Sequence, residues 1–224
     1  MNQVDFNTHH VTISKPELAQ LPCVDYRDGA LVIDSESGVE SAVKELESAR
    51  VIGFDTETRP SFKKGVTHVV SLMQLASPER CFLFRLNKIG LHPRIKELLE
   101  SPDHLKVGLS IHDDFHNLSK LGELHPAGFI DLQQFVKDYH IADNSLTRIH
   151  AILFGLRISK GQRLTNWEAL ELTESQINYA ALDAISCIRI YDYLRSGVFH
   201  PEESRYLREI EIPQADAEKH PEEA

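Results

Sequence analysis

Apolar residues along the chain follow two patterns, short continuous runs and positions spaced by three or four residues. Between Ser35 and Arg50 the second pattern puts four apolar residues on one helical face, namely Val39, Ala42, Val43 and Leu46. Further helices are predicted at 14–21, around 95–99, and at 114–121, 145–154 and 174–194. The runs predict strands at 30–35, 51–58, 67–77, 80–86 and 104–111, and a strand passing into a helix at 127–135.

The strands predicted at 67–77 and 80–86 are separated by little more than a turn, which indicates an antiparallel hairpin. A hairpin beside alternating strands and helices predicts an α/β fold with one mixed β-sheet flanked by helices. A chain of 224 residues, 42% of them hydrophobic, is long enough to bury one full core. We therefore expect a single domain at 29–197, preceded by an N-terminal extension at 1–28.

A C-terminal tail at 198–224 is predicted to be acidic and disordered, and its last segment, 214–224, reads QADAEKHPEEA. From Phe199 onward, eight acidic and three basic residues give a charge of −5, which is half of the total of −10. This acidity argues against a broad basic surface for duplex nucleic acid. It is compatible with an enzyme that holds a strand end through divalent cations, because bound cations offset clustered carboxylates.

The compartment is predicted from what the sequence lacks. No segment approaches the roughly 20 apolar residues that span a bilayer, so no membrane association is expected. The N-terminus lacks the basic start and apolar run of a secretory signal. Cys23, Cys81 and Cys187 are odd in number and far apart, which argues against a disulfide framework and a zinc site. We predict a cytoplasmic location.

The first motif with candidate chemistry is FDTET, at the end of the strand predicted at 51–58. Residues i and i+2 of a strand share a face, so Asp55 and Glu57 project together. Adjacent carboxylates repel each other unless a cation neutralises them, which indicates a metal site. A pair of acids at a solvent-facing strand end is the alternative.

The second motif, VGLSIHDD at 107–114, brings Asp113 and Asp114 to the first turn of a predicted helix. Acids are favoured there by the helix dipole and by capping, so a purely structural role is the alternative to a functional one. Asp113 suits the cap, whereas Asp114 faces differently. His112 and His116, which flank Asp114, are interpreted as ordinary helix residues rather than ligands.

The third motif, YAALD, lies in the helix predicted at 174–194. Residues i and i+4 of a helix share a face, so Tyr179 and Asp183 point the same way. Small residues around them let this helix pack closely on a sheet, where a buried aspartate is costly unless it is paired or bound to metal. A surface tyrosine with an acidic neighbour is the alternative.

Together, FDTET, VGxxIxxD about fifty residues later and YAALD near the end resemble the DEDD pattern of 3'-5' exonucleases in the DnaQ-like superfamily. The tyrosine variant is the most similar, as in ribonuclease D and the exonuclease domain of the Werner syndrome helicase. In the histidine variant a histidine stands five residues before the last aspartate, and that position is Asn178 here. The resemblance covers roughly residues 30–195, and VVSLMQLAS at 69–77 and the segment 160–184 add looser similarity.

The resemblance implies an RNase H-like fold and a metal-dependent exonuclease that hydrolyses phosphodiester bonds from the 3' end of DNA or RNA. It implies two Mg²⁺ or Mn²⁺ ions, for which the ligands are Asp55, Glu57, Asp114 and Asp183. Asp55 contacts both ions, and Asp114 holds the second. Tyr179 orients the attacking water, because a phenol with a pKa of about 10 is a poor general base at neutral pH. Ligands that are all oxygen suit Mg²⁺ and Mn²⁺.

Two basic segments are candidates for contact with the substrate, a single-stranded or 3'-end nucleic acid. Cations contact phosphates, and an aromatic ring stacks on a base. A solvated turn is the alternative for the first segment, RPSFKKG at 59–65, and Trp167 near the second is interpreted as a packing residue. The candidate contact residues are Arg59, Phe62, Lys63, Lys64, Lys160 and Arg163.

Two other functions stay open at this point. A catalytically silent scaffold would use the same fold to bind nucleic acid or protein, although it has no chemical need for clustered acids. An RNase H-like endonuclease would also use carboxylates and two cations, and it differs by cutting internally. The sequence leaves open the choice between DNA and RNA, the preferred cation, the oligomeric state and any protein partner.

Overall fold

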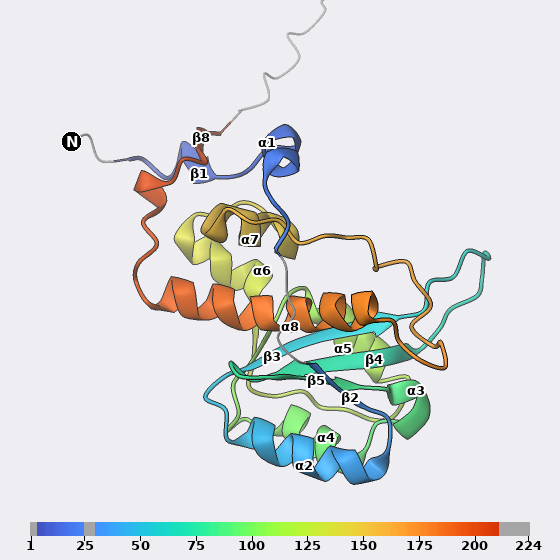
Figure 1. The fold of residues 1–224 in the computed structure, drawn as a ribbon. Coiled ribbons are helices and arrows are strands. Elements are labelled where there is room, and N and C mark those ends of the chain that lie inside the picture. Colours follow the sequence, from blue (N-terminus) through green and yellow to red (C-terminus); the bar gives the residue numbers. More distant parts are fainter. Residues whose placement is uncertain (1–3, 25–29, 211–224) are drawn as a thin grey trace, which may run out of the picture.

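The structure, a computed structural model, describes residues 4–24 and 30–210. Its centre is a six-stranded sheet in the order β2-β5-β4-β3-β6-β7 (Figure 1). β3, β4 and β5 pair antiparallel, whereas β2 is parallel to β5, and β6 is parallel to β3 and β7. The predicted hairpin is confirmed as β4 and β5. The strands are β2 (Ala30–Ile33), β3 (Ile52–Thr58), β4 (Val70–Ala76), β5 (Cys81–Phe84), β6 (Lys106–Gly108) and β7 (Phe129–Asp131).

Helices cover both faces of this sheet, which confirms the predicted α/β fold (Figure 1). One buried apolar cluster joins the sheet to α6 (Leu132–Phe135), α7 (Leu146–Phe154) and α8 (Glu174–Arg195). A second joins the other face to α2 (Glu36–Glu47), α4 (Pro93–Glu100) and α5 (Ile111–Leu118). No helix within the described ranges is long and apolar enough to cross a membrane. The short helical elements are α3 (Leu86–Ile89), η1 (Val136–Tyr139) and η2 (Pro201–Glu203).

Local sequence signals set the position of several helices. The apolar face predicted for α2 is buried in full. α8 begins at a capping box, in which the Thr173 hydroxyl accepts from the Gln176 backbone N–H and the Gln176 side chain accepts from the Thr173 N–H. Ser14 and Glu17 form the same arrangement at α1 (Lys15–Gln20).

The segment at 104–121 differs from its prediction. The strand predicted at 104–111 is reduced to β6, and the helix begins at Ile111 rather than at Asp114. Ser110 explains the difference, because its left-handed backbone, with a φ of 62°, ends the extended segment and precedes the helix. Asp113, the predicted cap, is instead an exposed residue of the first turn, and Ser110 holds the cap position.

Residues 198–210 are ordered, which corrects the prediction of a disordered tail that begins at 198. β8 (Leu207–Glu209) pairs antiparallel with β1 (His9–Val11), and the ring of Tyr206 is buried beside them. Strand pairing and burial of this ring outweigh the acidic composition of the segment. The predicted disorder of 214–224 concerns residues outside the described part of the chain, and the division at 28 and 197 stays a prediction.

α8 lies directly on β3 at Gly53. A Cβ atom at this position would be only 2.1 Å from the backbone oxygen of Ala184. Any residue with a side chain would therefore push the helix away from the sheet. Because Asp183 precedes Ala184 and Asp55 follows Gly53 by two residues, this contact sets the separation of the two acids.

Candidate active site

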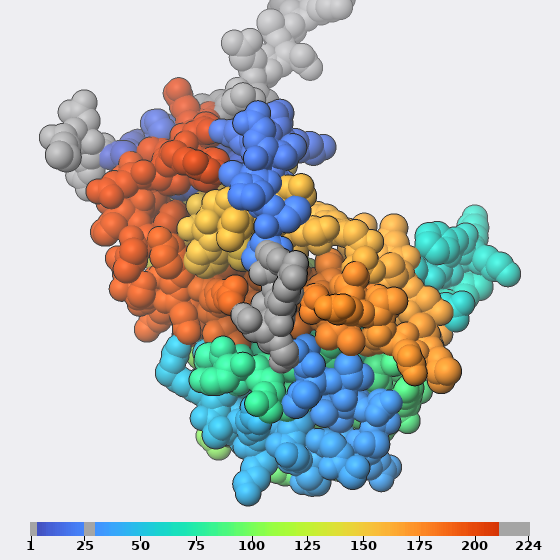
Figure 2. Space-filling model, in the orientation of Figure 1, coloured from blue at the N-terminus to red at the C-terminus, as the bar shows by residue number. Residues whose placement is uncertain are grey.

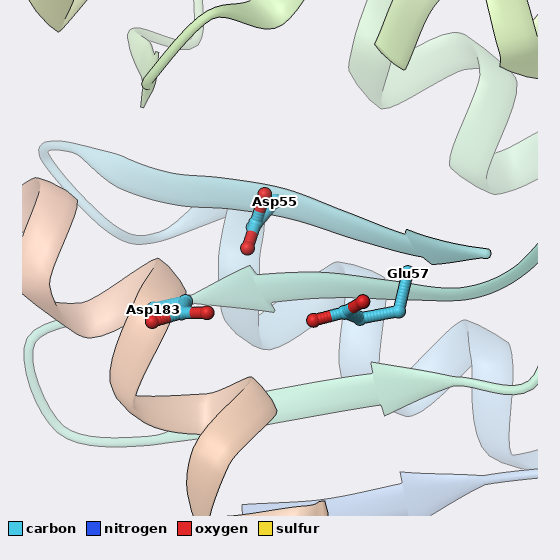
Figure 3. A group of neighbouring side chains, drawn as sticks. All are labelled: Asp55, Glu57 and Asp183. Carbon is cyan, nitrogen blue, oxygen red and sulfur yellow. The ribbon is translucent and has the colours of Figure 1, made fainter. Parts of the chain in front are cut away.

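Three carboxylates from two elements meet above the sheet. Asp55 and Glu57 share a face of β3, as strand alternation predicts, and α8 carries Asp183 across that face. Carboxylate oxygens of the three residues lie within 4.8 Å of one another. Figure 3 shows the three groups gathered between the strand and the helix. Asp183 is 6% and Glu57 8% exposed, so water solvates these carboxylates poorly.

The fourth predicted acid, Asp114, approaches this group from α5. Its carboxylate accepts a hydrogen bond from the hydroxyl of Thr56, which lies between Asp55 and Glu57 on β3. The charge of Asp114 helps to raise the pKa of both strand acids, after the larger effects of burial and of Asp183. Asp114 is therefore near enough to act on the cluster electrostatically, although it does not belong to the group of three within 4.8 Å.

Burial and mutual repulsion make the acids on β3 and α5 difficult to ionise. Loss of hydration, followed by the charges of Asp183 and Asp114, raises the pKa of Glu57 to about 9. The same causes raise the pKa of Asp55 well above its usual range. Burial raises the pKa of Asp114 to about 6, against the lowering effect of its hydrogen bond from Thr56.

Asp183 has neighbours that favour its charged form. Burial raises the pKa of Asp183 to about 7, while the hydroxyl of Tyr179 and the charge of Lys160 oppose the rise. The charge of Arg163 likewise lowers the pKa of Glu57. Two cationic side chains thus face the acidic cluster and offset part of its charge.

The donor set suits a hard divalent cation. The three clustered ligand groups are all carboxylates, whereas zinc sites usually take histidine or cysteine. His112 and His116 are exposed on α5 and lie outside this group. A bound cation would replace the lost hydration and cancel the repulsion among the acids, so these residues fit Mg²⁺ or Mn²⁺.

Tyr179 stands one helical turn before Asp183 on α8, and both residues line a cavity of about 280 Å³. The ring of Trp167 packs against the ring of Tyr179, with 6.2 Å between the ring centroids. Trp167 is fully buried, which confirms its interpretation as a packing residue. Burial and the charges of the acids raise the pKa of Tyr179 above its usual range, so the phenol keeps its proton at neutral pH.

The structure separates the six candidate contact residues into two groups. Lys160 and Arg163 line the same cavity as Tyr179 and Asp183. The other four belong to the segment after β3, which Figure 2 shows in teal, projecting beside the orange segment that precedes α8. The first group therefore lies at the acids, and the second lies on a projection away from the lining of the cavity.

Within the projecting segment, the candidate residues differ in their contacts. Phe62 is 83% exposed, and Lys63 and Lys64 are exposed beside it. Arg59 instead forms an ion pair, in which Nη1 donates to Oε2 of Glu168 at 3.0 Å. This pair ties the segment after β3 to the loop before α8.

The site also contains residues that the motifs did not single out. Thr56 holds Asp114, and its place inside FDTET was the available signal. Cys187 lines the cavity one helical turn after Asp183, a spacing from which it could have been predicted. Ser145 lines it from the position before α7, and no sequence spacing relates that residue to the acids.

Comparisons with known proteins agree on one family. A family model described as 3'-5' exonuclease matches residues 31–198. The bifunctional 3'-5' exonuclease/ATP-dependent helicase WRN of Mus musculus is 30% identical over 185 residues, covering 78% of this chain and 13% of that protein. The exonuclease 3'-5' domain-containing protein 2 of Drosophila melanogaster is 32% identical over 152 residues, covering 66% and 26%. The chain thus corresponds to about a quarter or less of the length of these two relatives.

Solved structures share the fold. The Nibbler EXO domain of Aedes aegypti matches with a TM-score of 0.69 at 22% identity, covering 81% of this chain and 96% of that chain. Escherichia coli RNase D matches with a TM-score of 0.65 at 23% identity, covering 77% of this chain and 45% of that chain. These matches agree with the RNase H-like mixed sheet. Because the family model extends from β2 to the end of α8 and includes all four acids and Tyr179, the chain belongs to the 3'-5' exonuclease domain family.

Proposed function

We propose that this protein is a metal-dependent exonuclease that removes nucleotides from the 3' end of DNA or RNA. The observation that carries the proposal is the meeting of Asp55, Glu57 and Asp183 within 4.8 Å, beside Asp114 and Tyr179. A buried cluster of acids is unfavourable for folding alone, so a chemical role accounts for it better than a structural one. Family membership supports the same reaction.

In this proposal the four carboxylates would hold a pair of Mg²⁺ or Mn²⁺ ions. Asp55 would be a ligand of both ions, Glu57 and Asp183 would complete the ligands of the first, and Asp114 would be a ligand of the second. When bound, such cations favour deprotonation of the attacking water and offset negative charge on the phosphate. The protein fixes the ligands in advance, through the hydrogen bond from Thr56 to Asp114 and the contact of α8 with β3.

Tyr179 orients the attacking water and does not act as a base. Its phenol keeps its proton because burial and the adjacent acids raise its pKa. A protonated hydroxyl donates one hydrogen bond and accepts others, which is what holding a water in line with the scissile bond requires.

We expect Tyr179→Phe to lower kcat by about 10²-fold, the size of effect associated with losing the orientation of a reacting group. Binding of Mn²⁺ should change little, because the phenol is not a ligand. The release of labelled mononucleotides gives kcat, and calorimetric titration gives the affinity for Mn²⁺. Tyr193→Phe, on the same helix, is the matched control, and an unchanged kcat in Tyr179→Phe would remove the hydroxyl from the mechanism.

The substrate we propose is a single strand or a frayed 3' end. Lys160 and Arg163 lie at the cavity, where they meet the phosphates nearest the scissile bond. Phe62 and its two neighbouring lysines contact the strand further from its end, by stacking and by charge. Because Arg59 is paired with Glu168, we expect it to hold this segment in place rather than to contact the strand.

Lys160→Glu combined with Arg163→Glu should weaken single-strand binding by at least about 10-fold, because two phosphate contacts are lost and replaced by repulsion. Fluorescence anisotropy of a labelled oligonucleotide in Ca²⁺, at fixed ionic strength, measures the affinity. Lys44→Glu combined with Lys137→Glu changes the net charge equally at exposed positions of α2 and η1. Equal weakening by both double variants would mean that only net charge matters.

The metal-free protein should lose stability as the pH rises. The folded state raises the pKa of Asp114 to about 6, of Asp183 to about 7 and of Glu57 to about 9, so it binds protons more tightly than the unfolded chain. This contribution is fully present below about pH 4 and is lost as the pH rises through those values. In EDTA, Tm should fall between pH 6 and pH 9, and the Tm gain from Mg²⁺ should grow over the same range. A Tm in EDTA that rises with pH would contradict the assignment.

One assay separates the proposal from its rivals. Single-stranded and recessed-end DNA and RNA, labelled at the 5' end, are incubated with Mg²⁺ or Mn²⁺. A ladder that shortens from the 3' end supports the exonuclease and shows which polymer is preferred. Internal cuts would indicate an endonuclease, and binding without cutting would indicate a silent scaffold.

We also propose a cytoplasmic location. Cys23, Cys81 and Cys187 are all free thiols, and the last two are buried. Free thiols of this kind are typical of a reducing compartment. Fractionation of cells that express the chain tests this, and recovery in an oxidising compartment would contradict it.

A further inference from the structure

Gln74 is a buried amide among apolar residues on one face of β4. It lies on β4 directly opposite Asp55 of β3, so the two side chains share the face that α8 covers. Its neighbours on the same face of β4 are Leu72 and Ala76, and on the adjacent strand β5 it pairs with Leu83. These three apolar residues are fully buried. Gln74 is thus the polar exception beside a catalytic acid.

The side chain of Gln74 has no partner of its own. It is 0% exposed, and neither Nε2 nor Oε1 has a hydrogen-bond partner among the described residues. An unpaired buried amide destabilises a fold, and a leucine or methionine would fill the same space without that cost. The presence of an amide here therefore indicates that Gln74 has a role other than filling space in the core.

We propose that Gln74 is a positioning residue: when Asp55 binds cations, the amide of Gln74, which makes no hydrogen bond within the described part of the chain, donates one to the Asp55 carboxylate and fixes the orientation of that carboxylate. Opposed residues on neighbouring strands have Cβ atoms about 5 Å apart, a gap that a glutamine side chain spans. The inference rests on the proposed function, because it concerns the same carboxylate.

Electrostatics favour an amide at this position over a charged group. Asp55 is already surrounded by Glu57, Asp114 and Asp183, so a further acid would add repulsion. A lysine would compete with the cations for the same oxygens. An amide N–H stabilises a carboxylate without adding charge and leaves its remaining lone pairs free for metal.

The test is calorimetric titration of the whole chain with MnCl₂ alone, in the absence of nucleic acid. Gln74→Met keeps the length of the side chain and removes its N–H donor. We expect Mn²⁺ to bind about 10-fold more weakly, the lower end of the effect of losing a group that holds a metal ligand. Leu75→Met, on the opposite face of the same strand, is the matched control and should leave the affinity unchanged. An affinity of Gln74→Met within about twofold of the parent would overturn the inference.

The parent protein distinguishes failure of this inference from failure of the proposed function. If the parent binds Mn²⁺ and Gln74→Met binds it equally well, only the role of Gln74 is lost. If the parent binds no Mn²⁺, the metal-dependent function and the role of Gln74 are both overturned.

A second measurement needs no substitution, so it stands even if Gln74→Met fails to fold. The side-chain amide signal of Gln74 is followed by NMR in the parent while Mg²⁺ is added. We expect one amide proton to shift downfield and to exchange more slowly with solvent as its hydrogen bond forms. A side-chain signal that stays in place while the backbone signal of Asp55 moves would overturn the inference.

Discussion

Asp183→Asn is expected to lower kcat by at least about 10³-fold, because an amide cannot replace a charged ligand that offsets charge in the transition state. The same substitution should stabilise the metal-free protein at pH 8. Burial holds the pKa of Asp183 at about 7, so its ionised form is disfavoured in the fold, and one pKa unit corresponds to about 1.4 kcal/mol. Single-turnover assays and thermal unfolding in EDTA measure the two effects. Asp55→Asn should behave in the same way.

The opposite signs of these two effects make the prediction specific. A residue that matters only for folding would lose activity together with stability. Asp113→Asn is the matched control, because Asp113 is exposed on α5 next to Asp114 and outside the cluster. Retained turnover in Asp183→Asn with saturating Mn²⁺ would end the exonuclease proposal.

Gly53→Ala should have the largest effect on stability. The added Cβ would lie 2.1 Å from the backbone oxygen of Ala184, and a backbone atom cannot rotate away as a flexible side chain does. Overpacking of this kind costs about 3 kcal/mol, which corresponds to a fall in Tm of roughly 6–12 °C for a chain of this size. Displacement of α8 also carries Asp183 away from Asp55, and a shift of about 1 Å can cost about 10²-fold in rate.

Gly122→Ala controls for the loss of glycine itself, because a Cβ at Gly122 would meet nothing within 4 Å. Thermal unfolding, steady-state kinetics and titration with Mn²⁺ compare the two variants with the parent. Gly53→Ala with parental Tm and parental affinity for Mn²⁺ would show that α8 moves freely over β3. The contact at Gly53 would then not set the separation of the acids.

The sequence predicts which side chains within one strand or helix point the same way, because the repeat of the element fixes which residues share a face. The pairing of Asp55 with Glu57 follows from a period of two, and that of Tyr179 with Asp183 follows from one helical turn. The same logic located the buried face of α2. It was less accurate at the second motif, where the left-handed backbone of Ser110 moved the start of the helix.

Contacts between distant elements were not accessible in this way. Nothing in the local pattern indicates that Arg59 pairs with Glu168, that Thr56 binds Asp114, or that residues 207–209 form a strand with residues 9–11. Each of these depends on loops that bring remote segments together, and composition alone suggested a disordered tail where β8 is found.

By itself, the sequence predicted the mixed α/β character of the fold and the pairs Asp55 with Glu57 and Tyr179 with Asp183, because strand and helix periods are local properties of the chain. The resemblance to the DEDD exonucleases added Asp114 to the predicted site. The tertiary structure alone decided how closely those acids approach one another and which basic side chains face them. It also decided that Gln74 lies opposite Asp55 without a hydrogen-bond partner among the described residues. These features arise where α8 crosses the sheet, and burial at that crossing determines both the charge state of the acids and the space between them.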